Sequence, residues 1–158
     1  MDDNKTIEQT EEEIIEAFSL FDTWEEKYEY IIDLGKKLPV LDDKYKLPEN
    51  IIRGCQSTVW LVADYEDARP DDPVGRGKIF FKADSDAVIV KGLVSMLIEV
   101  LSGHTPDEIL SAQLDFIRQI GMMNHLAQTR SNGLLSMVKQ MKNYALVYKS
   151  IHTPEKTI

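Results

Sequence analysis

The sequence predicts an α+β domain in which a small antiparallel sheet of about three strands packs against several helices. Segments with helical periodicity come first and last in the chain, and β-rich segments lie between them. The two clearest β-rich segments are joined by a short connection, which favours antiparallel pairing. Residues 87–101 are apolar on nearly every side of a helix, as expected when the rest of the domain surrounds it.

The first two helices are marked by their start signals. Thr10 and Thr23 are each followed three residues later by a glutamate, which is the pattern of a capping box. The second helix is expected to end near Gly35. The inward faces of the two helices are expected to carry Ile14, Phe18, Phe21, Trp24, Tyr28, Ile31 and Ile32.

The strands follow an irregular segment that Pro39 and Pro48 interrupt. Residues 58–65 are rich in β-branched and aromatic side chains and predict the first strand. Residues 66–77 contain two prolines, two glycines and four acids, which is typical of an exposed hairpin loop. The second strand is expected at 78–83, with one face formed by Ile79, Phe81 and Ala83.

The apolar segment 87–101 predicts the central helix of the core. We expect Asp84 or Ser85 to cap its start, and Ser102 with Gly103 to end it. The polar side chains of this segment fall four residues apart and form one stripe, at Lys91, Ser95 and Glu99.

Three more helices are expected after the central one. Thr105, Pro106 and Glu108 form a third start signal, and residues 115–120 predict another short helix. The final helix is expected at 131–149, where the apolar side chains recur with helical spacing at Leu134, Val138, Met141, Ala145 and Tyr148.

Length and charge limit the classes of function. The 158 residues fit a single domain, 1–158, with a core at about 10–150 and disordered tails on both sides. The net charge of −9 argues against nucleic-acid binding. No apolar run is long enough to span a bilayer, and the acidic N-terminus does not resemble a targeting signal. We therefore expect a cytoplasmic protein that does not associate with membranes.

The single cysteine, Cys55, excludes an intrachain disulfide and a metal site built from several thiolates of this chain. Cys55 follows Gly54 in a segment that precedes the first strand, where a loop can present a thiol. Arg53 lies two positions upstream and could favour the thiolate. Two interpretations remain open on position alone, a small buried hydrophobe and a reactive thiol.

Other groups are candidates for chemistry, and each has an ordinary structural explanation. Asp84 and Asp86 flank Ser85 and could hold a metal ion, although helix capping explains them as well. Arg130 precedes the final helix and could bind a partner or form an ion pair. A histidine could act as a base for Cys55 only if the fold brings it close. His104 is expected just after a helix ends, His125 in a loop and His152 in a frayed tail.

Four motifs of this sequence, in this order, resemble the SufE family of cysteine desulfuration proteins and its CsdE branch. They are RGCQSTVWL at 53–61, ADSDA at 83–87 with IVKGL at 89–93, SGHTP at 102–106 with Ile109, and RSNGL at 130–134 with Met137. The resemblance spans about residues 10–148, and the first two motifs are the specific ones. The sequence departs from the family pattern in the turn at 126–129 and in a long loop at 66–77, which could alter partner preference.

The resemblance implies a fold similar to that of iron–sulfur scaffold proteins. It implies that Cys55 accepts sulfur as a persulfide from a cysteine desulfurase of the SufS or CsdA type, stimulates that enzyme, and delivers the sulfur to a downstream iron–sulfur scaffold. The pyridoxal phosphate belongs to the partner, so this chain is expected to bind no cofactor and no metal. Residues expected to support Cys55 or to meet the partner are Arg53, Gly54, Gln56, Asp84, Asp86 and Arg130.

Two further expectations accompany this resemblance. The loop at 51–57 is expected to turn outward when the partner docks, because Gly54 makes it adaptable, and a homodimer is left open. A non-catalytic binding module that shares the fold is the alternative function. A cluster scaffold is disfavoured by the single cysteine, and a cysteine hydrolase by the lack of an evident base.

Overall fold

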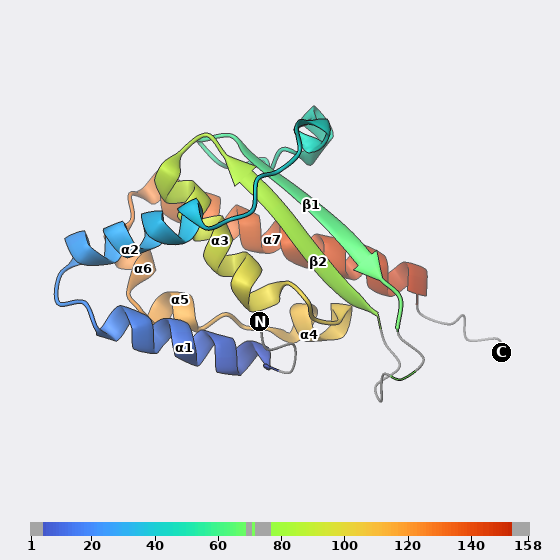
Figure 1. Ribbon diagram of the computed structural model, residues 1–158, viewed down its shortest axis with the longest axis horizontal. Helices are drawn as coiled ribbons and strands as arrows, with labels where there is room; N and C mark the ends of the chain where they lie inside the picture. The colour runs from blue at the N-terminus through green and yellow to red at the C-terminus, as the bar shows by residue number, and fades with distance from the viewer. Residues whose placement is uncertain (1–4, 69–70, 72–76, 153–158) are drawn as a thin grey trace.

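The structure is a computed structural model that describes residues 5–68, 71 and 77–152. A long β-hairpin lies over α3 and α7, and α1, α2 and α5 gather at one end of the molecule (Figure 1). In chain order the elements are α1 (Ile7–Ser19), α2 (Trp24–Lys36), the short 3-10 helices η1 (Asp43–Tyr45) and η2 (Pro48–Asn50), β1 (Val59–Glu66), β2 (Lys78–Ser85), α3 (Val88–Leu101), α4 (Pro106–Ser111), α5 (Phe116–Gln119), α6 (Met122–His125) and α7 (Gln128–His152).

The α+β class and the antiparallel pairing are confirmed, but the expected number of strands is wrong. Within the described residues the sheet contains β1 and β2 alone, paired from Val59 opposite Ser85 to Glu66 opposite Lys78. Two further segments contribute only isolated bridges, Ile51 with Trp60 of β1 and His104 with Ile79 of β2. Beside the first bridge, the Ile52 amide donates to the Val59 carbonyl at 2.9 Å, but the pairing does not extend into a third strand.

Helical segments and turns cover the outer edges of both strands. On α7, the hydroxyls of Tyr144 and Tyr148 donate to main-chain carbonyls of β1, at 3.4 Å and 3.1 Å. At the outer edge of β2, the Phe81 amide donates to Oγ of Ser102, the residue just after α3, at 2.9 Å. Edge groups that would otherwise attract another strand are therefore paired inside the domain.

The start of α1 differs from the expectation. Thr6, not Thr10, is the N-cap: its hydroxyl accepts from the Gln9 amide at 3.1 Å, and the Gln9 side chain accepts from the Thr6 amide at 2.9 Å. Thr10 lies inside the helix, buried, and its hydroxyl donates to the Thr6 carbonyl at 3.3 Å. A threonine can satisfy its hydroxyl in this way within a helix, so the glutamate three residues later did not mark a start. Thr23 and Thr105 are confirmed as N-caps. The full capping box forms at Thr105, whereas at Thr23 the Glu26 side chain accepts from the threonine hydroxyl and not from its amide.

α3 is the core helix that the sequence predicts, but neither expected residue is its N-cap. The N-cap is Ala87, without a side-chain cap. Ser85 Oγ accepts from the Ala87 amide at 3.2 Å, one residue before the helix, and Asp84 pairs with lysines instead. The backbones of α2 and α3 approach each other very closely at Gly92. A Cβ at this position would lie 2.0 Å from the Ile31 carbonyl oxygen.

The C-terminal part is more helical than expected. α7 begins at Gln128 and ends at His152, about three residues beyond each predicted end. His152 is therefore not frayed; its ring stacks on Tyr65 with centroids 3.9 Å apart. His125, expected in a loop, ends α6. Of the tails expected outside a core of about 10–150, residues 7–9 are helical and belong to α1. Residues 1–4 and 153–158, and most of the expected hairpin loop (69–70 and 72–76), lie outside the described residues.

Candidate functional site

Cys55 lies on the short segment that connects η2 to β1, and this segment faces α7. The side chain is partly buried, and no disulfide constrains it. Its thiol donates to the carbonyl oxygen of Gly133 on α7, at a sulfur–oxygen distance of 3.6 Å. The thiol therefore faces the interior of a cleft and not open solvent.

Glycines lie on both sides of this close approach, and the one on the loop is required for it. Gly54 has a φ of +93°, in the left-handed region where a side chain is strained, and a Cβ there would lie 2.4 Å from Ser136 Oγ on α7. Gly133 lies directly under the thiol, and a Cβ at that position would be 3.5 Å from Cys55 Sγ. The loop can therefore rest against α7 because position 54 lacks a side chain, whereas a Cβ at position 133 would make only an ordinary van der Waals contact.

A hollow of about 230 Å³ lies beside the thiol. Three consecutive loop residues line one side, α3 contributes Val90, and α7 with the turn before it forms the rest. The lining residues are Cys55, Gln56, Ser57, Val90, Ala127, Thr129, Arg130, Gly133 and Met137. Three of the four α7 residues are spaced four apart, at 129, 133 and 137, and occupy one face of the helix, and Arg130 lies next to the first of them.

Burial raises the pKa of the Cys55 thiol above its ordinary value. The raised pKa keeps the thiol protonated at neutral pH, which protects it from oxidation but also makes it a weak nucleophile. This arrangement therefore shelters the thiol and does not favour the reactive thiolate.

The turn before α3 holds the end of the Cys55 loop by three hydrogen bonds to Thr58. Asp86 Oδ1 accepts from the Thr58 amide at 3.0 Å, and the Ser85 hydroxyl donates to the Thr58 carbonyl at 2.8 Å. The Asp86 amide also donates to that carbonyl, at 3.3 Å. The turn thus fixes the chain three residues after the cysteine.

Asp84 belongs to a different cluster. Its carboxylate lies 3.1 Å from Lys46 Nζ and 3.4 Å from Lys91 Nζ. Burial acts to raise the pKa of Asp84, but the lysines and the Ser85 amide outweigh it, so the pKa lies below its ordinary value. The Lys46 ammonium also lies over the ring of Trp60, 5.5 Å from its centroid. Asp84 thus ties the segment before η2 to the end of β2.

The structure brings some of the predicted residues together and separates others. Gln56 and Arg130 line the hollow with Cys55, and Gly54 shapes the loop. Arg53 is exposed and is not among the lining residues. Val90, Thr129, Gly133 and Met137 were not singled out from the residues alone, although the four-residue spacing on α7 carried a signal for three of them.

Each histidine has neighbours elsewhere. His104 Nδ1 lies 3.4 Å from Glu108, and His125 stacks on Trp24 with centroids 4.0 Å apart. None of the lining residues of the hollow is a histidine. Within the described ranges, no group of three or more histidine, cysteine or acidic residues is placed to hold a metal ion.

Comparisons with known proteins place this geometry in a family. The profile of the SufE family, a domain associated with Fe–S metabolism, matches residues 12–145. An uncharacterized SufE-like protein of Rhizobium etli is 40% identical over 137 residues, which cover 86% of this chain and 89% of that protein. SufE-like protein 1 of Arabidopsis thaliana, described as chloroplastic/mitochondrial, is 37% identical over 147 residues, which cover 91% of this chain and 38% of that protein.

A solved structure supports the fold. The solution structure of a hypothetical protein from Thermus thermophilus matches with a TM-score of 0.70 at 19% identity, covering 89% of this chain and 96% of that chain. The chain belongs to the SufE family and carries its Fe–S metabolism associated domain. In the described part of the chain, no helix combines the length and the apolar character needed to cross a membrane.

Proposed function

We propose that Cys55 accepts a sulfur atom from a cysteine desulfurase of the SufS or CsdA type and passes it on for iron–sulfur cluster assembly. The observation that carries this proposal is the setting of Cys55, the single cysteine of a SufE-family chain, on a loop beside a hollow. A storage site for reactive sulfur needs a thiol that is sheltered at rest, because persulfides oxidise readily.

The transfer needs only thiol chemistry. The Cys55 thiolate attacks the terminal sulfur of a cysteine persulfide on the partner, a new S–S bond forms at Cys55, and the partner's thiolate leaves with the electron pair of the broken bond. No metal, cofactor or water-activating base takes part on this chain. The pyridoxal phosphate that releases sulfur from L-cysteine belongs to the partner.

Access to the partner requires the loop to move. Cys55 faces Gly133, so we expect residues 51–57 to leave α7 when the desulfurase docks, and solvation or partner groups then lower the pKa of the thiol. Hydrogen exchange of the amides in 51–57 is expected to become faster or slower on docking. Exchange rates that do not change would contradict the movement.

The rate of the partner's reaction tests the proposed function. We expect this chain to increase the rate at which a cysteine desulfurase releases alanine from L-cysteine, and Cys55→Ser to abolish most of that increase. The serine variant keeps the size of the side chain and removes the acceptor sulfur. Equal stimulation by both proteins would favour a binding module that acts by contact alone.

A further inference from the structure

One positively charged side chain, Arg130, lines the hollow beside Cys55. Arg130 is the one charged residue among its lining residues, in the first turn of α7. Its side chain is exposed, and among the described residues no acid forms an ion pair with it. A guanidinium is always charged and offers a planar set of donors that matches a carboxylate.

The remaining lining residues suit a small amphipathic molecule. Gln56, Ser57 and Thr129 offer hydrogen-bonding groups, and Val90 and Met137 offer apolar surface. The volume of about 230 Å³ is below the ~300 Å³ at which pockets for drug-sized ligands begin. A ligand the size of an amino acid therefore fits better than a peptide or a nucleotide.

Arg130 makes no hydrogen bond to the thiol that would hold it in place. The raised pKa of Cys55 comes from burial, and the thiol donates its hydrogen bond to Gly133. A cation that neither pairs with an acid nor activates the cysteine is free to bind a ligand that reaches from the rim of the hollow toward the sulfur.

We infer that the hollow binds a small thiol that carries a carboxylate, of the size of L-cysteine, with Arg130 holding the carboxylate, and that this thiol is a second acceptor of sulfur from Cys55. The inference rests on the proposed persulfide at Cys55. A small thiol can enter the hollow while the loop stays against α7, whereas a protein thiol needs the loop to move.

The step balances without an oxidant or a reductant. The thiolate of the small molecule attacks the outer sulfur of the Cys55 persulfide, and an S–S bond forms between them. The bond between that sulfur and Sγ breaks, its electron pair stays on Sγ, and the products are a small-molecule persulfide and the Cys55 thiolate. Cys55 is then ready for another sulfur.

The first experiment needs no sulfur transfer and therefore tests the site alone. Cys55 is alkylated with iodoacetate, which carries a carboxylate, and with iodoacetamide, which is neutral but similar in size. The ratio of the two rates is compared in the wild type, Arg130→Gln and Lys139→Gln. Lys139 is on the same helix, nine residues away and outside the hollow, so its replacement removes an equal charge away from the thiol.

We expect Arg130→Gln to lower the iodoacetate-to-iodoacetamide ratio about fivefold, the upper range for an exposed ion pair, and Lys139→Gln to leave it nearly unchanged. Equal ratios in all three proteins, or an equal fall in both variants, would overturn the carboxylate site. Because the thiol itself is the probe, this result does not depend on whether a desulfurase loads Cys55.

The second experiment tests the acceptor. Cys55 is converted to a mixed disulfide and then to a persulfide with sulfide, so no desulfurase is needed. Sulfur transfer to 3-mercaptopropionate, which carries a carboxylate, is compared with transfer to 2-mercaptoethanol. We expect Arg130→Gln to lower the preference for 3-mercaptopropionate about fivefold. An unchanged preference would overturn the second acceptor and leave the desulfurase-dependent function untouched.

Discussion

At the scale of single residues, Cys55 combines shelter with a pKa that favours the neutral thiol. Its sulfur faces the Gly133 carbonyl at 3.6 Å, and burial raises its pKa. A thiol in an activated site is usually placed near cations that lower its pKa, and no such effect offsets burial here. The structure therefore shows a sheltered thiol that is not activated, and under the proposed function activation is expected to come with the partner.

The raised pKa predicts a specific pH dependence. The rate of alkylation of Cys55 in the folded protein is expected to rise with a midpoint above that of the same cysteine in urea. The stability that comes from keeping the thiol neutral is present below the ordinary thiol pKa and is lost as the pH rises through the folded-state pKa. Cys55→Ala should remove this alkaline loss. Coincident midpoints in the folded and unfolded protein would contradict the burial.

Gly54→Ala is expected to loosen the loop. The left-handed φ of +93° makes a side chain there cost about 1 kcal/mol or more, and its Cβ would lie 2.4 Å from Ser136 Oγ. Cys55 alkylation should become faster, with a small fall in the free energy of unfolding. Ser136→Ala in the same chain should recover only the steric part, because the strain in φ remains. Unchanged alkylation would show that the loop tolerates a side chain.

At the scale of elements, the turn between β2 and α3 restrains the Cys55 loop, although the two segments are far apart in the sequence. Asp86 and Ser85 bind both polar groups of Thr58. Asp86→Ala leaves the Thr58 amide without its carboxylate partner and should increase the rate of Cys55 alkylation several-fold, because the loop then opens more often. Asp22→Ala, at an exposed acid between α1 and α2 and outside the hollow, is the matched control. Equal rates in the two variants would mean that the turn does not restrain the loop.

The contact between α2 and α3 should be sensitive to single methyl groups. A Cβ on Gly92 would lie 2.0 Å from the Ile31 carbonyl oxygen, so Gly92→Ala must separate the helices and should destabilise the fold by about 2–3 kcal/mol. Gly133→Ala is the matched control, since its Cβ would meet Cys55 Sγ at an ordinary 3.5 Å. Chemical denaturation measures both. A Gly92→Ala protein as stable as the control would contradict the close packing.

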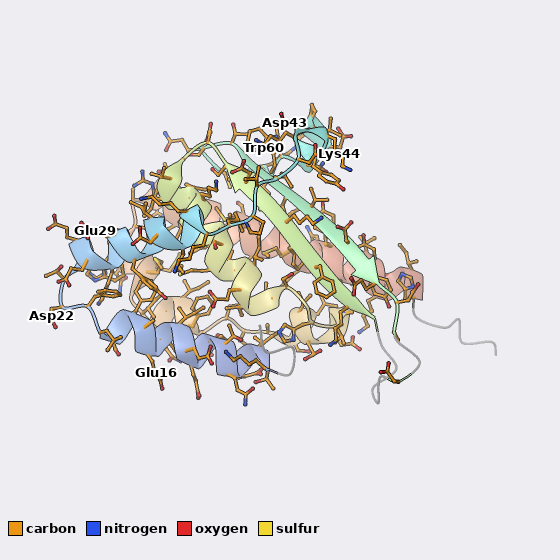
Figure 2. All side chains as sticks on the ribbon, in the orientation of Figure 1. Glu16, Asp22, Glu29, Asp43, Lys44 and Trp60 are labelled. Carbon is orange, nitrogen blue, oxygen red and sulfur yellow. The ribbon has the colours of Figure 1, made fainter. Side chains whose placement is uncertain are left out.

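At the scale of the whole molecule, charge is distributed unevenly. The acidic side chains of α1, α2 and the turn between them, among them Glu16, Asp22 and Glu29, project away from the body of the domain (Figure 2). The net charge of the chain is −9. Such a surface can steer a partner with a basic face and repels other acidic proteins.

Much of the fold could be predicted because local signals agreed with the packing. The thin polar stripe on residues 87–101 predicted a buried helix, and α3 (Val88–Leu101) is that helix. The start of α1 and the number of strands could not be predicted. Thr10 satisfies its hydroxyl within the helix, and side chains from α7 and from the turn after α3 pair with groups at the outer edges of the two strands.

The site could be predicted only in part. Cys55 stood out as the single thiol, and Gln56 and Arg130 do line its hollow. One side of the hollow is lined by Gly133 and Met137, which lie about 80 residues later in the chain, so long-range packing and not local sequence creates it. Asp84 was expected to cap α3 and instead pairs with two lysines, a partnership that no local spacing indicates.

Intact mass spectrometry tests the central claim most directly. The protein is incubated with a cysteine desulfurase and L-cysteine, separated from it, and weighed beside Cys55→Ser treated in the same way. A gain of about one sulfur atom that a reducing thiol removes, present in the wild type and absent from the variant, is the result we predict. No gain in the wild type with desulfurases of the SufS and CsdA types, or an equal gain in Cys55→Ser, would contradict the assignment of Cys55 as the sulfur acceptor.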